Sequence, residues 1–165
     1  MSVSSSEQSQ ESYLRPFVIT RMHEDDLNFV VEIEEQSGLN RWGYDAYRRE
    51  LLTNPNAVMF VARNLYPGPS VIGFLAGWTV EDEMHVNNIA THPDYRRMGI
   101  GESLMDAAIE EGFRRGARHV LLEVRASNES AQLLYRKLGF SYVARRRDYY
   151  RFPTEDAFVM KLELK

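Results

Sequence analysis

The segment from Arg96 to Gly101 has the residue types and spacing that point most directly to chemistry. It reads Arg-Arg-Met-Gly-Ile-Gly and stands between a strand-like and a helix-like stretch. Glycines let the backbone approach a ligand closely, and the start of the following helix offers free N–H groups and a positive dipole end. The segment fits a phosphate or pyrophosphate site as well as it fits a glycine turn that simply starts a helix.

The residues beside this segment narrow the choice of ligand. No Gly-Lys-Ser/Thr sequence follows, and Leu104 stands where a dinucleotide-binding fingerprint has its third glycine. The segment is therefore neither a Walker loop nor a Rossmann loop. Glu102 would repel a pyrophosphate, although a carboxylate in the first turn of a helix is also an ordinary complement to the helix dipole.

Two further residues are candidates for acid–base chemistry. Glu123 interrupts the apolar stretch at residues 120–124, and on a central strand its carboxylate would lie in a dry place suited to a general base. Composition alone favours a solvated face on which Glu123 pairs with Arg125. Tyr135 lies on the buried stripe of an expected helix, where a core tyrosine with a satisfied hydroxyl is the commoner explanation.

Other polar residues have several interpretations. Strand alternation puts His85 and Asn87 on one face, which could be core, solvent face or substrate wall. Asn128 is explained by N-capping of the helix that follows it. The tyrosines Tyr149 and Tyr150 come just after three arginines at residues 145–147, which we interpret as a solvated turn and not as a nucleic-acid site.

Charge and composition exclude several classes of protein. The 165 residues include 20 Lys and Arg against 24 Asp and Glu, so the net charge of −4 argues against a general binder of nucleic-acid phosphates. The absence of cysteine excludes disulfides, iron–sulfur clusters and an acyl-cysteine intermediate. The four histidines show no metal-binding spacing, so no metal site is expected.

The apolar segments are too short for a membrane span. The longest run, residues 71–78, is well below the roughly 20 residues that a spanning helix needs. The polar N-terminus has no apolar core of the kind found in signal peptides, so a cytoplasmic location is expected. Residues 1–13 are expected to form a disordered polar tail, and residues 14–165 a single domain.

Hydrophobic periodicity and turn signals alternate along the chain. Strands are expected at residues 17–21, 57–63, 71–80, 84–91, 120–124, 140–146 and 157–164. Helices are expected at residues 24–35, 44–52 and 102–115, and from Ser127 or Asn128 to residue 138. This order predicts an α+β fold with a mixed sheet and helices on both of its faces.

Taken together, these segments resemble the GNAT N-acetyltransferases, and within them the RimI group of ribosomal-protein-alanine N-acetyltransferases. The resemblance spans residues 18–164 and rests on residues 88–101, 122–128, 131–140 and 146–160. It implies a central mixed, mostly antiparallel sheet of about seven strands. That sheet would be splayed between its fourth and fifth strands, where the cofactor enters, and would have about four helices.

The resemblance also implies roles for individual residues. Acetyl-CoA is the expected donor and coenzyme A the product, with no metal. Glu123 matches the family's catalytic base and Tyr135 its acid. The expected cofactor-binding residues are Ile89, Ala90 and Thr91 for the pantetheine arm, Arg97, Met98, Gly99, Ile100, Gly101 and Glu102 for the pyrophosphate, and Asn128. The expected acceptor residues are Trp42, Tyr149 and Tyr150.

The function that this resemblance implies is acetylation of a protein N-terminus, with a ribosomal protein's N-terminal alanine as the favoured acceptor. The amine would attack acetyl-CoA directly in a ternary complex. Gly38, Arg41 and Gly43 depart from the family's usual aromatic residue, proline and serine in the acceptor loop, whereas Trp42 is kept. Two alternatives are a GNAT enzyme acting on a small amine or lysine, and an acyl-CoA-binding module without turnover.

Overall fold

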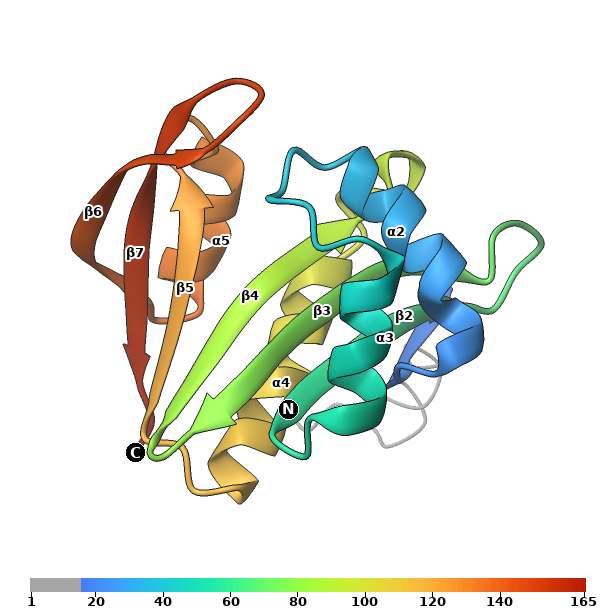
Figure 1. Cartoon of the computed structure of the whole chain (residues 1–165), viewed down its shortest axis with the longest axis horizontal. Coiled ribbons are helices and arrows are strands. Elements are labelled where there is room, and N and C mark those ends of the chain that lie inside the picture. The colour runs from blue at the N-terminus through green and yellow to red at the C-terminus, as the bar shows by residue number, and fades with distance from the viewer. Residues whose placement is uncertain (1–15) are drawn as a thin grey trace, which may run out of the picture.

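The computed structural model describes residues 16–165, which form one seven-stranded sheet with helices on both faces (Figure 1). The predicted tail at residues 1–13 lies outside the described residues. The strand order is β1-β2-β3-β4-β5-β7-β6, and the sheet is antiparallel except between β4 and β5. The strands are β1 (Phe17–Arg21), β2 (Ala57–Asn64), β3 (Val71–Val80), β4 (Glu83–Thr91), β5 (His119–Arg125), β6 (Ser141–Tyr150) and β7 (Glu155–Glu163).

The helices divide between the two faces of the sheet. Helices α2 and α3 lie on the face toward the viewer in Figure 1, and α4 lies behind the sheet. Two apolar clusters result, one between the sheet and α4 and one beneath α2 and α3; we call them the α4 cluster and the α2–α3 cluster. The described helical segments are η1 (Glu24–Asp26), α2 (Leu27–Glu35), α3 (Tyr44–Thr53), η2 (Pro93–Tyr95), α4 (Ile100–Arg114) and α5 (Glu129–Lys137).

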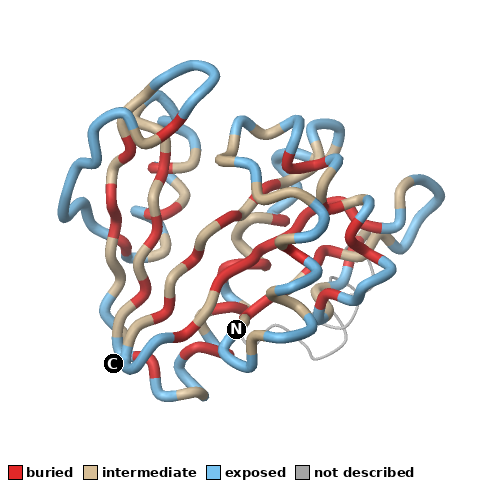
Figure 2. The backbone as a smooth tube through the Cα atoms, in the orientation of Figure 1, coloured by how far each residue is buried: buried red, intermediate tan, exposed pale blue. Residues whose placement is uncertain are grey.

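The predicted α+β fold and the order of its main elements are confirmed. Periodic apolar residues define the buried stripe of each long helix: Leu104, Met105 and Ala108 of α4 are fully buried. In Figure 2 buried backbone runs along β3 and β4, whereas β6 at the edge of the sheet is mostly exposed. The core therefore lies under the central strands, next to the point where β4 and β5 part.

One boundary was predicted wrongly. Tyr149 and Tyr150 were expected on the connection between the last two strands, and the preceding arginines in a turn. All of them belong to β6, because Tyr150 still pairs with Glu155 of β7 after an irregular stretch that begins beyond Arg146. Asp148 has a positive φ of 52° in this stretch, so the strand bends but does not end there.

The strands β4 and β5 pair over only part of their length. Their parallel register runs from Glu83 opposite His119 to Val86 opposite Leu122 and then stops. Beyond these residues β5 continues to pair with β7, and β4 with β3, so the two halves of the sheet diverge (Figure 1). The later part of β4 thus leaves its backbone groups on this side free for a ligand.

A β-bulge at Asn87 coincides with this divergence. On β3, Ala76 pairs with Asn88 and Gly77 pairs with Val86, so Asn87 is the extra residue. Gly77 is required opposite the bulge, because a Cβ there would collide with the carbonyl oxygen of His85. Bulges of this kind redirect side chains and are common beside active sites.

The bulge also exchanges the faces toward which β4 side chains point. Before it, Val86 packs in the α4 cluster; after it, the Asn88 amide donates to the hydroxyl of Tyr47 in α3 at 2.7 Å. Ile89 then packs against the α4 cluster, whereas His85 pairs with Trp78 on the face of α2 and α3. The simple alternation expected along β4 is therefore interrupted between Val86 and Asn88.

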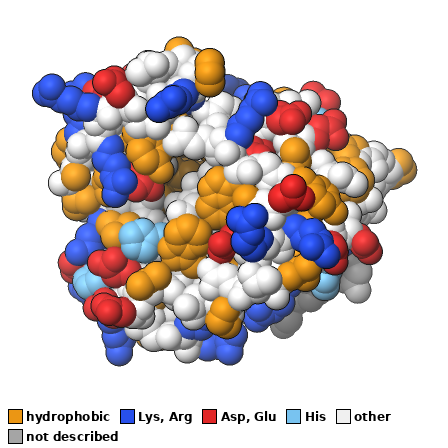
Figure 3. Space-filling view, viewed as in Figure 1, with side chains coloured by type: hydrophobic (Ala, Val, Ile, Leu, Met, Phe, Trp, Pro, Cys, Tyr) orange, Lys and Arg blue, Asp and Glu red, His pale blue; other side chains and the backbone are white. Residues whose placement is uncertain are grey.

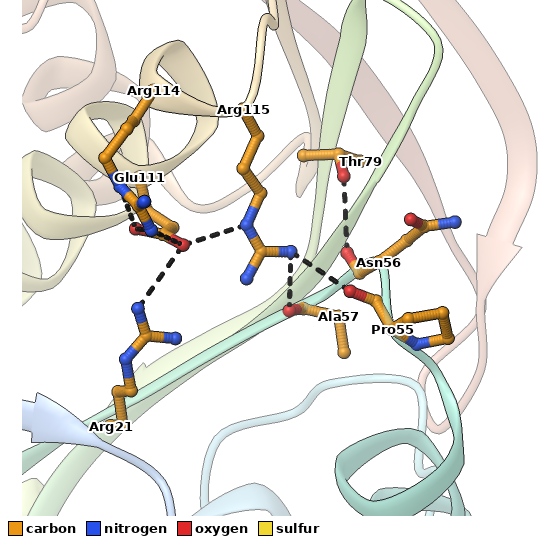
Figure 4. A network of polar contacts seen from close by, with 8 residues as sticks. All are labelled: Arg21, Pro55, Asn56, Ala57, Thr79, Glu111, Arg114 and Arg115. Atoms are coloured by element: carbon orange, nitrogen blue, oxygen red, sulfur yellow. Dashed lines mark hydrogen bonds and ion pairs between the residues drawn. The ribbon is translucent and has the colours of Figure 1, made fainter.

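An ion-pair network fastens α4 to the first strands (Figure 4). The buried carboxylate of Glu111 accepts from Arg114 at 2.6 Å, from Arg115 at 2.8 Å and from Arg21 of β1 at 3.4 Å. Arg115 also donates to the carbonyl oxygen of Ala57 at 3.1 Å. Hydrogen bonds from Arg114, and then from Arg115, lower the pKa of Glu111 to about 2 against the opposing effect of burial.

Candidate active site

A pocket that opens to solvent lies where β4 and β5 diverge. Its lining comes from both faces of the sheet, since Leu122 and Val124 belong to the α4 cluster and Arg125 reaches the loop between α2 and α3. The pocket therefore joins the two faces. Its polar and aromatic lining residues are Ser37, Asn87, Glu123, Arg125, Asn128, Tyr135 and Tyr150.

Glu123 lies in this pocket on a central strand. Its side chain is 16% exposed, and the nearest cation is Arg146 of β6, with 3.6 Å between Nη2 and Oε1. The expected solvated pair with Arg125 is wrong, because the Arg125 guanidinium turns instead to Glu155 at 3.4 Å and to backbone carbonyls. A mostly buried carboxylate that faces a cleft is suited to accept a proton from a bound amine.

Tyr135 and Tyr150 line the same pocket from different elements. Tyr135 projects from α5, and Tyr150 ends β6. Both rings are buried, and burial raises the pKa of each phenol above its ordinary value. Each hydroxyl thus remains a proton donor at neutral pH, and Tyr135 both belongs to the α4 cluster and lines the pocket.

The glycine segment begins α4 with an open N-terminus. Gly99 is the N-cap residue in the left-handed region, with φ of 80°, and a glycine has no side chain to accept from the first N–H groups of the helix. Arg97 before it also has a positive φ, of 63°, and residues 96–99 are exposed. An exposed, uncapped N-terminus of a 15-residue helix is suited to a phosphate group.

Two contacts bring this end of α4 against α5. A Cβ at Gly101 would lie 3.3 Å from Cδ2 of Leu134, so the glycine permits close packing of the two helices. Lys137 donates to the carboxylate of Glu102 at 3.1 Å, which offsets the charge expected to repel a pyrophosphate. Of the predicted phosphate-binding residues, Gly101 and Glu102 are thus placed beside α5, which carries Tyr135, whereas Met98 is exposed and Ile100 is buried in the α4 cluster.

The remaining predicted cofactor residues flank the pocket. Ile89 lines it, and Ala90 and Thr91 continue β4 past the last residue that pairs with β5. Asn128 lines the pocket and also caps α5, because its side chain accepts from the N–H of Ala131 at 3.1 Å. The structure therefore gathers these residues along the free edge of β4 and the start of α5.

The loop between α2 and α3 forms another wall of the pocket, and Arg125 makes a hydrogen bond to it. Nε of this arginine donates to the carbonyl oxygen of Gly38 at 2.9 Å. Its other nitrogens donate to the carbonyl oxygens of Arg151 at 3.1 Å and Pro153 at 3.0 Å, and its guanidinium lies 4.5 Å from the centre of the Tyr150 ring. One side chain thus connects the two loops that border the pocket.

The predicted acceptor residues occupy different positions. Trp42 stacks on Trp78 and packs against Tyr47 in the α2–α3 cluster, next to the pocket wall but not among its lining residues. Tyr149 is partly buried, and its carbonyl accepts from Asn40 of the α2–α3 loop at 3.2 Å. Of the three predicted acceptor residues, Tyr150 alone lines the pocket within the described part of the chain.

A buried carboxylate in α2 shapes the same loop. Glu34 is 1% exposed and accepts from the backbone N–H groups of Trp42 and Gly43 and from the Tyr47 hydroxyl. Sequence reasoning missed Glu34, whose only signal was a carboxylate in the apolar repeat of a helix. It also missed the role of Arg125, for which the sequence offered only an arginine at a strand end.

Between residues 16 and 165 there is no group of three or more His, Cys, Asp or Glu side chains able to hold a metal ion. In that same range no helix is long and apolar enough to cross a membrane.

The fold and the site define a class of protein. The model of the GNAT acetyltransferase family matches residues 20–140, and the chain belongs to this family. The predicted enzyme class, an acyltransferase, is confirmed with it.

Particular relatives come from one group within that family. The chain is 33% identical to the ribosomal protein bS18-alanine N-acetyltransferase of Escherichia coli K12, over 88% of this chain and 97% of that protein. It is 34% identical to the enzyme of the same name from Haemophilus influenzae, over 87% and 96% of the two chains. These similarities confirm the resemblance to the RimI group.

Solved structures agree with the sequence relatives. The crystal structure of ribosomal-protein-S18-alanine N-acetyltransferase from Escherichia coli superposes with a TM-score of 0.78 at 31% identity, covering 90% of this chain and 94% of that one. Ard1 from Thermoplasma volcanium gives 0.79 at 25% identity, over 91% and 99% of the chains. The predicted splayed sheet is therefore confirmed as the fold of this family.

Proposed function

We propose that this protein transfers the acetyl group of acetyl-CoA to the N-terminal α-amine of a protein in the cytoplasm. The proposed acceptor is ribosomal protein bS18 with an N-terminal alanine, the acceptor in the names of the relatives above. One observation carries the proposal: Glu123 and Tyr135, from strand β5 and helix α5, line a single pocket at the splay of the sheet.

The residues beside the pocket fit acetyl-CoA as donor. The uncapped N-terminus of α4 at Gly99 supplies N–H groups for the pyrophosphate, with Arg97 beside it. The free edge of β4 from Ile89 to Thr91 offers backbone groups for the pantetheine amides. When bound there, acetyl-CoA supplies the activated acetyl group that is transferred.

Glu123 supplies the base. An α-amine has a pKa of about 8, so most of it is protonated at neutral pH and cannot attack a thioester. The carboxylate of Glu123 takes this proton, directly or through one water molecule. Its position on the α2–α3 side of β5 fits an amine that arrives past the Gly38 loop.

Tyr135 supplies the acid. The amine nitrogen forms a bond to the thioester carbon, the carbon–sulfur bond breaks, and its electron pair stays on sulfur. The Tyr135 phenol, kept protonated by burial, gives its proton to that sulfur. The ammonium loses two protons as it becomes an amide. Glu123 takes the first before the attack, and the second leaves the nitrogen after the carbon–nitrogen bond has formed and restores the Tyr135 phenol. The products are then the amide, the coenzyme A thiol and one proton, which Glu123 passes to solvent.

The acceptor end of the pocket favours an extended peptide over a small amine. It is bordered by the α2–α3 loop and by the end of β6, which Arg125 holds together. Tyrosine hydroxyls at Tyr149 and Tyr150 can hydrogen-bond peptide backbone without reading side chains. Hydrophobic side chains gather in the middle of this face, between the α2–α3 part and the β6–β7 part (Figure 3).

A direct experiment compares acceptors. Coenzyme A release is measured with a set of peptides that differ only in the first residue, including the bS18 N-terminal peptide, and with spermidine and an N-terminally blocked lysine peptide. We expect fastest release with free N-termini that begin with alanine. Faster release with spermidine or the lysine peptide would favour the small-amine or lysine alternative.

The same assay separates catalysis from binding alone. An acyl-CoA-binding module without turnover would bind acetyl-CoA in calorimetry and release no coenzyme A with any acceptor. We expect turnover, and we expect Glu123→Gln to bind acetyl-CoA like the wild type while losing most of that turnover.

A further inference from the structure

The amide of Asn87 is an unused donor in the candidate active site. Asn87 lines the pocket, and its Nδ2 is buried without a hydrogen-bond partner among residues 16–165. A buried donor that stays unpaired is unfavourable, so this position is suited to an acceptor that a ligand would bring. None of the steps above uses this group.

The position of Asn87 in the strand limits which ligand atom it can meet. Asn87 is the extra residue of the bulge, one place beyond Val86, the last β4 residue paired with β5. Glu123 likewise stands one place beyond Leu122 on β5, so both residues lie at the point where the two strands begin to separate.

The two residues line one pocket from the neighbouring strands β4 and β5. Asn88 reaches Tyr47 on the face of α2 and α3, and Ile89 packs with the α4 cluster. The bulge interrupts strand alternation between Val86 and Asn88, and Asn87 lines the pocket together with Val86 and Ile89 of the α4 cluster. Glu123 points toward Arg146 of β6.

We propose that Nδ2 of Asn87 donates a hydrogen bond to the carbonyl oxygen of the bound thioester and stabilises the negative charge that grows on it as the amine attacks. The inference rests on acetyl-CoA being the donor in the proposed function. The thioester reaches the pocket from the α4–α5 face, which carries Tyr135, Asn128 and the phosphate-binding segment.

The chemistry requires such a donor. When the amine nitrogen bonds to the thioester carbon, the carbonyl electron pair moves onto oxygen, and it returns when the carbon–sulfur bond breaks. Donors aimed at this oxygen in a dry site accelerate acyl transfer, and removal of one costs about 10²–10³-fold in kcat. The bulge, which the glycine at position 77 permits on the opposite strand, fixes the backbone position from which the Asn87 side chain extends.

The test uses Asn87→Leu, which keeps the size of the side chain and removes the donor, with Asn28→Leu on the exposed surface of α2 as matched control. We expect kcat of Asn87→Leu to fall by about 10²-fold, with the acceptor KM within twofold of wild type. The kinetics use whichever amine the wild type acetylates fastest, so a wrong acceptor assignment would leave this test intact.

A binding measurement on the same variants needs no turnover. S-ethyl-CoA has the same chain as acetyl-CoA and lacks the carbonyl oxygen. Wild type is expected to bind acetyl-CoA about fivefold more tightly than S-ethyl-CoA, and Asn87→Leu to bind the two equally. Asn87→Ala, which also lacks a donor, repeats both measurements if the leucine variant does not fold.

Three results would overturn the proposal. They are a kcat of Asn87→Leu within twofold of wild type, a loss confined to the acceptor KM, and an unchanged preference for acetyl-CoA over S-ethyl-CoA. The second would assign the amide to the acceptor amine's side of the pocket. Failure of the proposed function would look different, since wild type itself would then show no transfer to peptide N-termini.

Discussion

Nε of Arg125 donates to the carbonyl oxygen of Gly38 at 2.9 Å and thereby ties strand β5 to the loop between α2 and α3. The same guanidinium holds the carbonyl oxygens of Arg151 and Pro153 on the far side of the pocket. Its side chain is 15% exposed, so these charge-assisted bonds are shielded from water. The acceptor entrance therefore depends on one side chain that contacts neither proposed proton-transfer residue.

Replacing Arg125 with methionine should loosen both loops. Methionine keeps the apolar stem and removes every one of these hydrogen bonds. We expect the KM for a peptide acceptor to rise about tenfold, which corresponds to the loss of about one charge-assisted hydrogen bond. The KM for acetyl-CoA should stay within twofold of wild type. Arg49→Met, on the exposed surface of α3, is the matched control. Equal increases in both KM values would mean that Arg125 supports the fold in general.

Glu123→Gln should remove the base and keep its shape. We expect kcat to fall by about 10²–10⁴-fold, while the dissociation constant for acetyl-CoA stays within twofold of wild type. Glu163→Gln, an exposed carboxylate at the end of β7, should change neither value. Wild-type turnover in Glu123→Gln at neutral pH would show that another group takes the proton.

Tyr135→Phe should retain the fold and lose the proton donor. The ring still packs against Phe140, and the hydroxyl is removed, so kcat should fall by about 10²-fold or more while the melting temperature changes little. Because burial raises the pKa of Tyr135, its protonated form persists beyond pH 10. The wild-type rate should therefore show no loss from this group between pH 8 and 10. A lower melting temperature with unchanged turnover would support a purely structural tyrosine.

Gly99→Val should abolish binding of acetyl-CoA. A branched side chain at the N-cap occupies the space that the pyrophosphate needs, and φ of 80° adds strain. Gly116→Val, just beyond the other end of α4, is a matched control with a φ of 97° and open space around it. Acetyl-CoA should raise the melting temperature of wild type and Gly116→Val but not of Gly99→Val. Equal protection of all three would contradict the phosphate-binding role.

Glu111→Gln should destabilise the protein without changing the site. The arginine bonds lower the pKa of Glu111 to about 2, so its carboxylate stabilises the fold above pH 4.5 by roughly 1–3 kcal/mol and loses this effect as pH falls toward 2. Urea unfolding at several pH values should show wild type more stable than the variant at pH 7, with the difference shrinking below pH 4.5. A difference that stays constant with pH would rule out this carboxylate as its source.

The sequence predicted the elements better than it predicted their pairing. Apolar periodicity located each long helix and the central strands of the sheet, because these elements have a buried face. It could not reveal the bulge at Asn87, since one extra residue leaves the local pattern of β4 intact and is detected only against β3. The extension of β6 to Tyr150 was missed for a similar reason, because polar residues on an edge strand give no alternating apolar signal.

The candidate site was likewise predictable only in part. The glycine segment, Glu123 and Tyr135 were visible in the sequence because residue type and family resemblance marked them. The ion-pair partner of Glu123 could not be predicted, because Arg146 lies on β6, and β7 separates β6 from β5 in the sheet. The connection between Arg125 and Gly38 joins residues 87 positions apart and depends on tertiary packing alone.

The most direct test of the proposed activity is where the acetyl group goes on one peptide that offers two amines. The bS18 N-terminal peptide, beginning with alanine and carrying one internal lysine, is incubated with acetyl-CoA and the protein, and the product is mapped by fragment mass spectrometry. We predict acetylation of the alanine α-amine with the lysine unmodified, and loss of this product with Glu123→Gln. Acetylation of the lysine at an equal or greater rate would contradict N-terminal acetylation as the function of this protein.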